Sequence, residues 1–514
     1  MAQRITIDPV TRIEGHLRID VEIDGGKVVD AWSTGTMFRG IEMLLKGKHP
    51  WDAQQVTERI CGVCPLVHGT ASSYALDDAL KVSLPDNARL IRNLMLGSNF
   101  LQSHILHFYH LSALDYIDIA AVTKYTGSDP GLVAVKDKIT ALVQANDAYP
   151  FLPRYESLDY LSDPALVTTL VSHYIQALDM RKKAQEMIAI FYGRMPSFVG
   201  TIPGGVTQPP SISNIAAMQS RLAELETWVN NVYLQDVLAV AEAYKALANG
   251  VGYAGGNFLA YGGFDLDAAG KEKFLPRGII LNGDITSVKP FDEKLITESV
   301  IHSWYKNGTD GLQPANGKTD PEVTDYDPAN KYSFLKAPRY DGKPMEVGPL
   351  SRMLVKKPQI LLDLVTKYGI TQPGLVARHG ARAIEASLIA AEMNNWLAQL
   401  KPGAPIWDKR DIPESSTGRG LVEGPRGALG HWIDIKDKRI DNYQAVVPTT
   451  WNASPRDKNG VRGPIEQSMI GIPVPDPDNP INVVRNVRSF DPCIACAVHV
   501  IHPEHNGVKA FRVV

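Results

Sequence analysis

The chain has 514 residues, of which 44% are hydrophobic and 21% charged, and its formal net charge at pH 7 is −3. This is ordinary globular composition, and the length predicts several packed layers or more than one domain. The mixed charge offers no basic surface for nucleic acid, and only four cysteines exclude a disulfide-rich scaffold.

Two stretches bear on the relation of the chain to membranes. The N-terminus has no apolar core of the signal-peptide kind, so we expect no secretion signal in this chain. The longest uncharged run, 93–114, is interrupted by Asn, Gln, Ser and His. It predicts a buried core helix and not a transmembrane segment.

The first half of the chain begins with strands and continues with helices. Residues 4–35 alternate polar and apolar side chains around Asp24-Gly25-Gly26, which predicts an antiparallel hairpin within an N-terminal β segment of about 1–50. Helical periodicity begins near Trp51 and defines a helical core of about 51–250. Its strongest segments are 86–124, 159–193 and 211–250, and the last of these ends on a glycine.

The second half predicts an irregular insertion followed by helices and strands. Residues 251–345 are rich in Gly, Pro, Asp and aromatics, which indicates irregular structure with small sheets. Helices return at 350–401, 431–452 alternates as a hairpin, and 463–499 mixes a helix with loops. The fold class is therefore mainly α with antiparallel β, an α+β arrangement of several layers.

All four cysteines lie in two Cys-x-x-Cys pairs, at 61–64 and 493–496. A thioredoxin-like dithiol belongs in a βαβ unit, which this pattern lacks, and zinc-binding pairs usually lie about 15–20 residues apart. A structural zinc that joins the two ends of the chain stays open. Four converging thiolates also suit copper(I), iron–sulfur, or nickel and iron. His68 and His499 follow the two pairs at similar distances and could orient the thiolates.

Eight motifs, in order along almost the whole chain, resemble those of the large subunit of nickel–iron hydrogenases. They are RIEGH (12–16), FRGIE (38–42), RICGVCPLVH (59–68), HFYHLSALD (107–115), GPRGALGH (424–431), VVPTTWNASPRD (446–457), RGPIE (462–466) and DPCIACAVH (491–499). The resemblance implies a central bundle of long helices. The fold is shared with the 49 kDa subunit of respiratory complex I, a quinone-module relative that lacks these cysteines.

The resemblance implies a catalytic subunit that cleaves H2 heterolytically and reversibly to protons and electrons. Its cofactor would be a nickel–iron centre whose iron carries cyanide and carbon monoxide. By this similarity Cys61 and Cys493 would be terminal ligands of nickel, whereas Cys64 and Cys496 would bridge nickel and iron.

Further residues around the centre are implied by the same motifs. Glu14 is similar to the family's proton relay beside Cys493, and a buried carboxyl group with a raised pKa can move protons near neutral pH. Arg426 would lie over the open side of the metals as a base or electrostatic helper, although arginine is a poor base. Asp491 would lie beside the centre.

Three other side chains would surround the iron. Pro448 and Thr449 would face a cyanide, with Thr449 donating a hydrogen bond to it. His68 would hydrogen-bond the bridging Cys496. Ser103 stands where many relatives have an acidic residue, which is a departure from the family pattern. His107 and His110, on the same expected helix, are more simply explained as core histidines.

The resemblance also implies a second metal, magnesium or a similar divalent ion. Its ligands would be the Glu42 carboxylate, the backbone carbonyl of Ala445 and the His499 side chain. Imidazole is unusual for magnesium, so the location is better supported than the identity of the ion.

The chain leaves no cysteine for an electron path and has no dinucleotide fingerprint, so a partner must accept the electrons. The family supplies an iron–sulfur small subunit in a heterodimer. It also uses nickel-insertion proteins and an endopeptidase that would remove residues 500–514, leaving a single catalytic unit of residues 1–499. We expect a periplasmic or membrane-associated site through the small subunit, with a cytoplasmic site left open. A structural zinc clamp is the non-enzymatic alternative.

Overall fold

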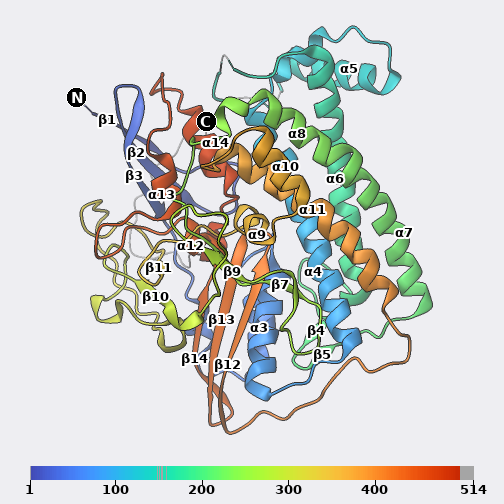
Figure 1. The fold of residues 1–514 in the computed structure, drawn as a ribbon, viewed down its shortest axis with the longest axis vertical. Coiled ribbons are helices and arrows are strands. Elements are labelled where there is room, and N and C mark those ends of the chain that lie inside the picture. The colour runs from blue at the N-terminus through green and yellow to red at the C-terminus, as the bar shows by residue number, and fades with distance from the viewer. Residues whose placement is uncertain (1, 148, 150, 152–153, 158, 498–514) are drawn as a thin grey trace.

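The computed structural model describes residues 2–147, 149, 151, 154–157 and 159–497, and of Cys496 and Ala497 it describes only their place in the last helix. Long helices fill one side of the molecule and the sheets fill the other (Figure 1). The largest helices are α4 (Asp86–Leu106), α6 (Pro164–Tyr192), α7 (Ile212–Trp228) and α11 (Leu375–Ala398).

Helix α4 lies in the middle of this bundle. It packs against α6 and α11, and α7 also contacts both of these helices. Since α4 is covered on all sides, most of its side chains are buried, including the polar Asn99 and Ser103. A helix covered all round needs no polar face. This confirms the expected core helix, which continues beyond Leu106 as a π-helical turn, His107–Ser112.

Shorter helices complete the α layer and the regions near the sheets. They are α1 (Ile41–Leu45), α2 (Asp52–Glu58), α3 (Pro65–Leu80), α5 (Pro130–Gln144), α8 (Leu234–Ala243), α9 (Pro349–Lys356), α10 (Gln359–Lys367), α12 (Pro448–Asn452), α13 (Pro464–Met469), α14 (Ile481–Ser489) and α15 (Ile494–Ala497). A second π-helical turn is Val229–Tyr233, and 3₁₀ turns are Ala113–Asp115, Ile119–Lys124, Lys245–Leu247, Glu293–Leu295, Asn307–Thr309 and Pro314–Asn316.

Two antiparallel sheets of three strands stand at the two ends of the chain. The first has the order β1-β2-β3 and joins Asp24 to Lys27 across the expected hairpin turn. The second has the order β12-β13-β14, and α3 lies against β12 and β13 (Figure 1). Their strands are β1 (Gln3–Ile7), β2 (Leu17–Asp24), β3 (Lys27–Gly35), β12 (Ser415–Gly424), β13 (Gly427–Lys436) and β14 (Arg439–Val446).

The insertion consists of irregular chain with small two-stranded pairs, as expected for 251–345. Its short strands are β6 (Phe258–Ala260), β7 (Gly263–Asp265), β8 (Lys273–Leu275), β9 (Gly278–Ile280), β10 (Ile296–Ser299) and β11 (Ala337–Tyr340). Two further short strands, β4 (Thr201–Ile202) and β5 (Gly205–Val206), precede the insertion. The short strands pair as β4-β5, β6-β9, β7-β8 and β10-β11.

The structure differs from the sequence-based expectation in two places. The helix expected to end on Gly250 ends at Ala243, because the Tyr244 hydroxyl donates to the backbone oxygens of Tyr116 and Asp159 and draws the chain aside. The hairpin expected at 431–452 starts earlier and includes a third strand, β12, whereas its last residues form α12.

Helix starts follow local rules. Asp129 and Asp163 cap α5 and α6 by accepting the backbone N–H of Leu132 and Leu166, and a proline follows each cap. This arrangement satisfies donors that the first turn leaves open. Among the residues that the structure describes, no helix is long and apolar enough to cross a membrane.

Candidate metal centre

Three cysteines from opposite ends of the chain meet in the interior. The Sγ atoms of Cys61, Cys64 and Cys493 lie within 4.8 Å of one another, and those of Cys61 and Cys493 are 3.3 Å apart. Their side chains are 3, 6 and 1% exposed. The side chain of Cys496 lies outside the described part of the structure, although its backbone belongs to α15. A buried group of sulfur ligands is suited to a soft metal.

The first cysteine pair lies at the start of α3. Cys64 is the residue before the helix, and Pro65 occupies its first position. The backbone N–H groups of Val63 and Cys64 donate to Cys61 Sγ at 3.2 and 3.3 Å. Amide donors and the positive end of a helix both favour a thiolate, which is the form that binds metal.

The N-terminal segment is joined to the second cysteine pair through Glu14. The backbone N–H of Glu14 donates to Pro492 O at 3.3 Å, and Ile494 N–H donates to Glu14 O at 2.7 Å. Gly15 follows with a φ of +84°, and a Cβ atom there would lie 2.6 Å from Ala495 N. The motif therefore needs glycine at this position, because any side chain would separate the two segments.

The carboxylate of Glu14 points at the sulfur group. Its Oε2 accepts from Cys493 Sγ at 3.3 Å and from Ala495 N–H at 3.0 Å. Burial raises the pKa of Glu14, and the charge of Cys61 raises it further, while these two hydrogen bonds act in the opposite direction. The structure thus places a half-buried proton acceptor beside one cysteine.

Arg426 and Asp491 form a pair close to the cysteines. Arg426 Nε donates to the backbone oxygen of Asp491 at 3.0 Å, and Nη2 lies 3.0 Å from Asp491 Oδ1 as an ion pair. Burial would lower the pKa of Arg426, but Asp491 and the cysteine sulfurs raise it well above its usual value. The guanidinium therefore stays charged, which favours an electrostatic role over a role as base.

A small cavity of about 20 Å³ adjoins the sulfur atoms. Its lining includes Cys64, His68, Arg426, Pro448, Thr449 and Cys493. The Thr449 hydroxyl oxygen accepts the backbone N–H of Cys493 at 3.0 Å. Among the described residues, Arg426 Nη1 and Nη2 have no partner of hydrogen-bond geometry. Buried donors of this kind are usually satisfied, so the cavity is suited to a bound acceptor.

His68 has a partner that the sequence analysis missed. Its Nδ1 lies 3.2 Å from His431 Nε2, and His431 Nδ1 lies 2.7 Å from the Tyr443 hydroxyl. His431 belongs to the GPRGALGH motif, but nothing in the local pattern shows that it faces His68. Burial lowers the pKa of His68 to about 4 and that of His431 well below its usual value.

Glu42 and Ala445 also lie together. The Ala445 N–H donates to Glu42 Oε1 at 2.9 Å, and the Thr319 hydroxyl donates to Oε2. His499 lies outside the described residues. Nearby, the buried Lys336 contacts Glu298 Oε2 at 3.1 Å and Gln444 Oε1 at 3.2 Å. Sequence reasoning missed this group because the charges come from separate irregular segments.

The histidines after Ser103 each have a hydrogen-bond partner. His104 Nε2 pairs with Glu385 at 2.8 Å, and the Nε2 atoms of His107 and His110 lie 2.7 and 3.2 Å from the backbone oxygens of Arg488 and Tyr174. This agrees with the expectation of core histidines for His107 and His110. Ser103 is fully buried, and its hydroxyl has no hydrogen-bond partner among the residues described.

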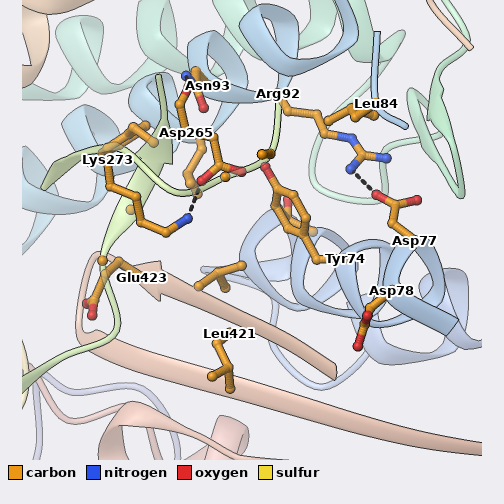
Figure 2. A pocket seen from close by; sticks show the side chains of 18 of the residues that line it. Tyr74, Asp77, Asp78, Leu84, Arg92, Asn93, Asp265, Lys273, Leu421 and Glu423 are labelled. Carbon is orange, nitrogen blue, oxygen red and sulfur yellow. Dashed lines mark hydrogen bonds and ion pairs between the residues drawn. The ribbon is translucent and has the colours of Figure 1, made fainter. Parts of the chain in front are cut away.

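Two larger cavities, of about 620 Å³ and about 580 Å³, lie outside this centre. Figure 2 shows the latter, where Asp77 of α3 faces Arg92 and Asp265 faces Lys273, with Tyr74 between the two pairs. Asp77 lies about 20 Å along α3 from Cys64, at 1.5 Å per residue. Its charges are paired, Asp77 with Arg92 at 2.5 Å and Asp265 with Lys273. Most of the charge in this pocket is therefore already engaged within the protein.

Comparisons with known proteins give a consistent answer over the whole chain. The family model described as nickel-dependent hydrogenase matches residues 39–499, and one described as HoxL-like matches residues 4–33. The periplasmic [NiFeSe] hydrogenase large subunit of Desulfomicrobium baculatum is 42% identical, over 98% of this chain and 96% of the relative. The hydrogenase-2 large chain of Escherichia coli K12 is 37% identical over the full length of both.

Solved structures agree with the sequence relatives. The [NiFeSe] hydrogenase of D. baculatum superposes with a TM-score of 0.87 at 42% identity, covering 97% of this chain and 100% of that one. The reduced Ni-Fe-Se hydrogenase of Desulfovibrio vulgaris Hildenborough gives the same TM-score and coverage at 40% identity. The chain belongs to the nickel-dependent hydrogenase family. Within it, the chain is a large, catalytic subunit, an oxidoreductase that acts on H2.

Proposed function

We propose that this subunit splits H2 into two protons and two electrons, reversibly, at a nickel–iron centre held by Cys61, Cys64, Cys493 and Cys496. The meeting of three buried sulfur atoms from both ends of the chain is the observation that carries this proposal. Cys496 follows Cys493 by one helical turn, which is compatible with a fourth ligand.

The residues around the sulfur atoms could bind the cyanide and carbon monoxide that are expected on iron. Arg426 brings two buried nitrogens that have no hydrogen bond of good geometry among the described residues, and cyanide is a hydrogen-bond acceptor. Pro448, Thr449 and His68 line the same cavity. Cys61 and Cys493 would hold nickel alone, whereas Cys64 and Cys496 would hold both nickel and iron. When bound, the centre supplies the place where H2 is polarised and from which electrons leave.

Glu14 receives the proton in this proposal. Its Oε2 lies 3.3 Å from Cys493 Sγ, within reach of a proton that leaves the sulfur. The raised pKa makes the carboxylate a better acceptor than an ordinary surface glutamate. Arg426 and Asp491 hold their positions by a charged pair, so Arg426 contributes positive charge and not proton transfer.

A divalent ion such as magnesium would occupy a second site. Glu42 would supply a carboxylate oxygen and Ala445 its carbonyl, and their closeness through the Ala445 N–H supports the location. His499 would complete the site. Nearby charges, from Lys336 and Glu298, would orient water molecules that fill the remaining positions.

The electrons pass to a small subunit that carries iron–sulfur clusters, in a heterodimer. The relatives named above are large subunits, and one is periplasmic by name. We place this protein likewise in the periplasm or at the membrane through its partner. Nickel-insertion proteins would load the centre, and an endopeptidase would then remove residues 500–514, leaving 1–499 as one catalytic unit.

Metal analysis of the complex purified from its native host tests the centre. We expect about one nickel and one iron for each chain, and loss of nickel and of H2 oxidation in Cys61→Ala and Cys493→Ala. Ser98→Ala, a buried substitution of similar size on α4, is the control and retains both. Zinc in place of nickel and iron, or full activity of Cys493→Ala, would refute the proposal.

A further inference from the structure

Three buried side chains form a hydrogen-bonded row that starts at the candidate metal centre. His68 comes from α3, His431 from β13 and Tyr443 from β14. Their exposed fractions are 1, 0 and 2%. The row joins His68 Nδ1 to His431 Nε2 at 3.2 Å and His431 Nδ1 to the Tyr443 hydroxyl at 2.7 Å.

The middle imidazole of this row, His431, has a partner at each ring nitrogen. Burial lowers the pKa of His431 well below its usual value, so the ring is neutral near pH 7. A neutral imidazole has one N–H donor and one acceptor nitrogen. His431 must therefore choose one tautomer, and the hydrogen bond at one nitrogen decides what the other nitrogen can do.

Tyr443 sets the direction of the row. Among the described residues, His431 Nδ1 is the acceptor that has hydrogen-bond geometry to the Tyr443 hydroxyl. The hydroxyl is buried, and a buried O–H group is nearly always satisfied by an acceptor. The phenolic proton therefore goes to His431 Nδ1. His431 then carries its own proton on Nε2 and donates it to His68 Nδ1.

This leaves the proton of His68 on Nε2. His68 also lines the cavity beside Cys64 and Cys493, and Nδ1 is already engaged by His431. A donor at Nε2 stabilises a thiolate, whereas a lone pair at that nitrogen would repel it. The tautomer thus decides whether His68 lowers or raises the proton affinity of sulfur in the centre.

We propose that His431 and Tyr443 are positioning residues that lock His68 in the tautomer with its proton on Nε2, so that His68 donates to a metal-bound sulfur. This inference rests on the proposed nickel–iron centre. It matches the general design of metal sites, in which outer hydrogen bonds fix the tautomer of an imidazole and tune the ligands.

Neutron diffraction from crystals of the loaded heterodimer, grown in D2O near pD 7, tests the direction of the row. We expect deuterium on Nε2 of both His68 and His431, and on the hydroxyl oxygen of Tyr443. Deuterium on Nδ1 of either imidazole would overturn the proposal. A wild-type complex without nickel and iron would instead count against the proposed function, so the two failures are distinguishable.

Tyr443→Phe tests the consequence. It removes the hydroxyl that directs His431, so we expect ¹⁵N spectra of histidine-labelled protein to show His68 in both tautomers. Nickel retention or H2 oxidation should fall about 10–100-fold, as for other outer-sphere partners of metal ligands. Tyr192→Phe is the control, since Tyr192 is also buried, accepts one hydrogen bond from Thr201 and lies outside the row. The proposal would be overturned if Tyr443→Phe kept the wild-type tautomer pattern. It would also be overturned if the variant retained metal and turned over at the wild-type level.

Discussion

Cys493 and Glu14 lie in register although they are 479 positions apart. Cys493 Sγ is 3.3 Å from Glu14 Oε2, and the two residues form an isolated parallel β-bridge. The backbone thus holds the acid beside the sulfur, and the contact does not depend on a flexible side chain alone. Any change in either segment changes the geometry of proton transfer, because hydrogen-bond distance must be kept.

Glu14→Gln should separate proton transfer from metal binding. Glutamine keeps the shape and can still accept the N–H of Ala495, but it has no titratable proton. We expect turnover and H2/D⁺ exchange to fall about 10²–10⁴-fold, the usual size of a general acid–base contribution, with nickel and iron retained. Glu22→Gln, on β2 of the N-terminal sheet, is the control. Exchange at the wild-type rate in Glu14→Gln would show that protons take another route.

Asp115→Asn should destabilise the segments that hold the centre. The buried Asp115 accepts two bonds from Arg488 Nη1, at 2.7 and 2.8 Å, and pairs with Arg12. Arg488 in turn donates to Thr11 O at 2.9 Å, so this group joins the start of the chain to α14. Removing the carboxylate leaves buried positive charge, at a cost of about 3–5 kcal/mol.

The apparent unfolding temperature of the purified complex measures this effect. Asp115→Asn should unfold at a clearly lower temperature than wild type, and Asp137→Asn, at an exposed position on α5, should not. Equal unfolding temperatures for the two variants would mean that solvent or another group compensates the charge of Arg488.

Glu466 predicts a pH dependence of stability. Burial raises the pKa of Glu466 to about 7, although the hydrogen bonds from the Ser33 N–H and the Tyr332 hydroxyl lower it. As the pH rises, the unfolded chain releases the proton of Glu466 near pH 4.5, whereas the folded protein keeps it until about pH 7. The contribution of this proton to the free energy of unfolding is fully present below about pH 4.5. It is lost as the pH rises to about 7, a change of about 3 kcal/mol.

Glu466→Gln removes this titration while it keeps the acceptor oxygen. Between pH 5 and pH 8 the unfolding temperature of wild type should fall relative to that of the variant, because only wild type loses the proton. Glu272→Gln, at an exposed position, should follow wild type at every pH. A constant difference in unfolding temperature between variant and wild type across this range would mean that Glu466 does not change protonation on unfolding.

The mass of the mature chain is the last prediction. Because the proposed magnesium ligand His499 ends the last motif, we expect protein from the native host to comprise residues 1–499 once nickel is bound. Intact-mass spectrometry of nickel-loaded and nickel-free protein measures this directly. Loaded, active protein that still contains residues 500–514 would contradict it.

The sequence by itself determined the features that depend on neighbours along the chain. The hairpin at Asp24-Gly25-Gly26, the starts of α5 and α6 after aspartate and proline, and the buried α4 all follow from local turn, capping and burial rules. The two Cys-x-x-Cys pairs and the ordered motifs also identified the family, because ligand type and spacing are written directly in the sequence.

Only the tertiary structure decided which of these residues meet. The bridge between Glu14 and Cys493 and the row from His68 to Tyr443 join segments that are distant in sequence, and local periodicity contains no information about such pairs. Local periodicity also could not show that the helix ends before Tyr244, since the hydrogen-bond partners of the Tyr244 hydroxyl lie in other elements. Burial then changes the chemistry: the raised pKa of Glu466 and the neutral His68 arise from the desolvation that packing alone imposes.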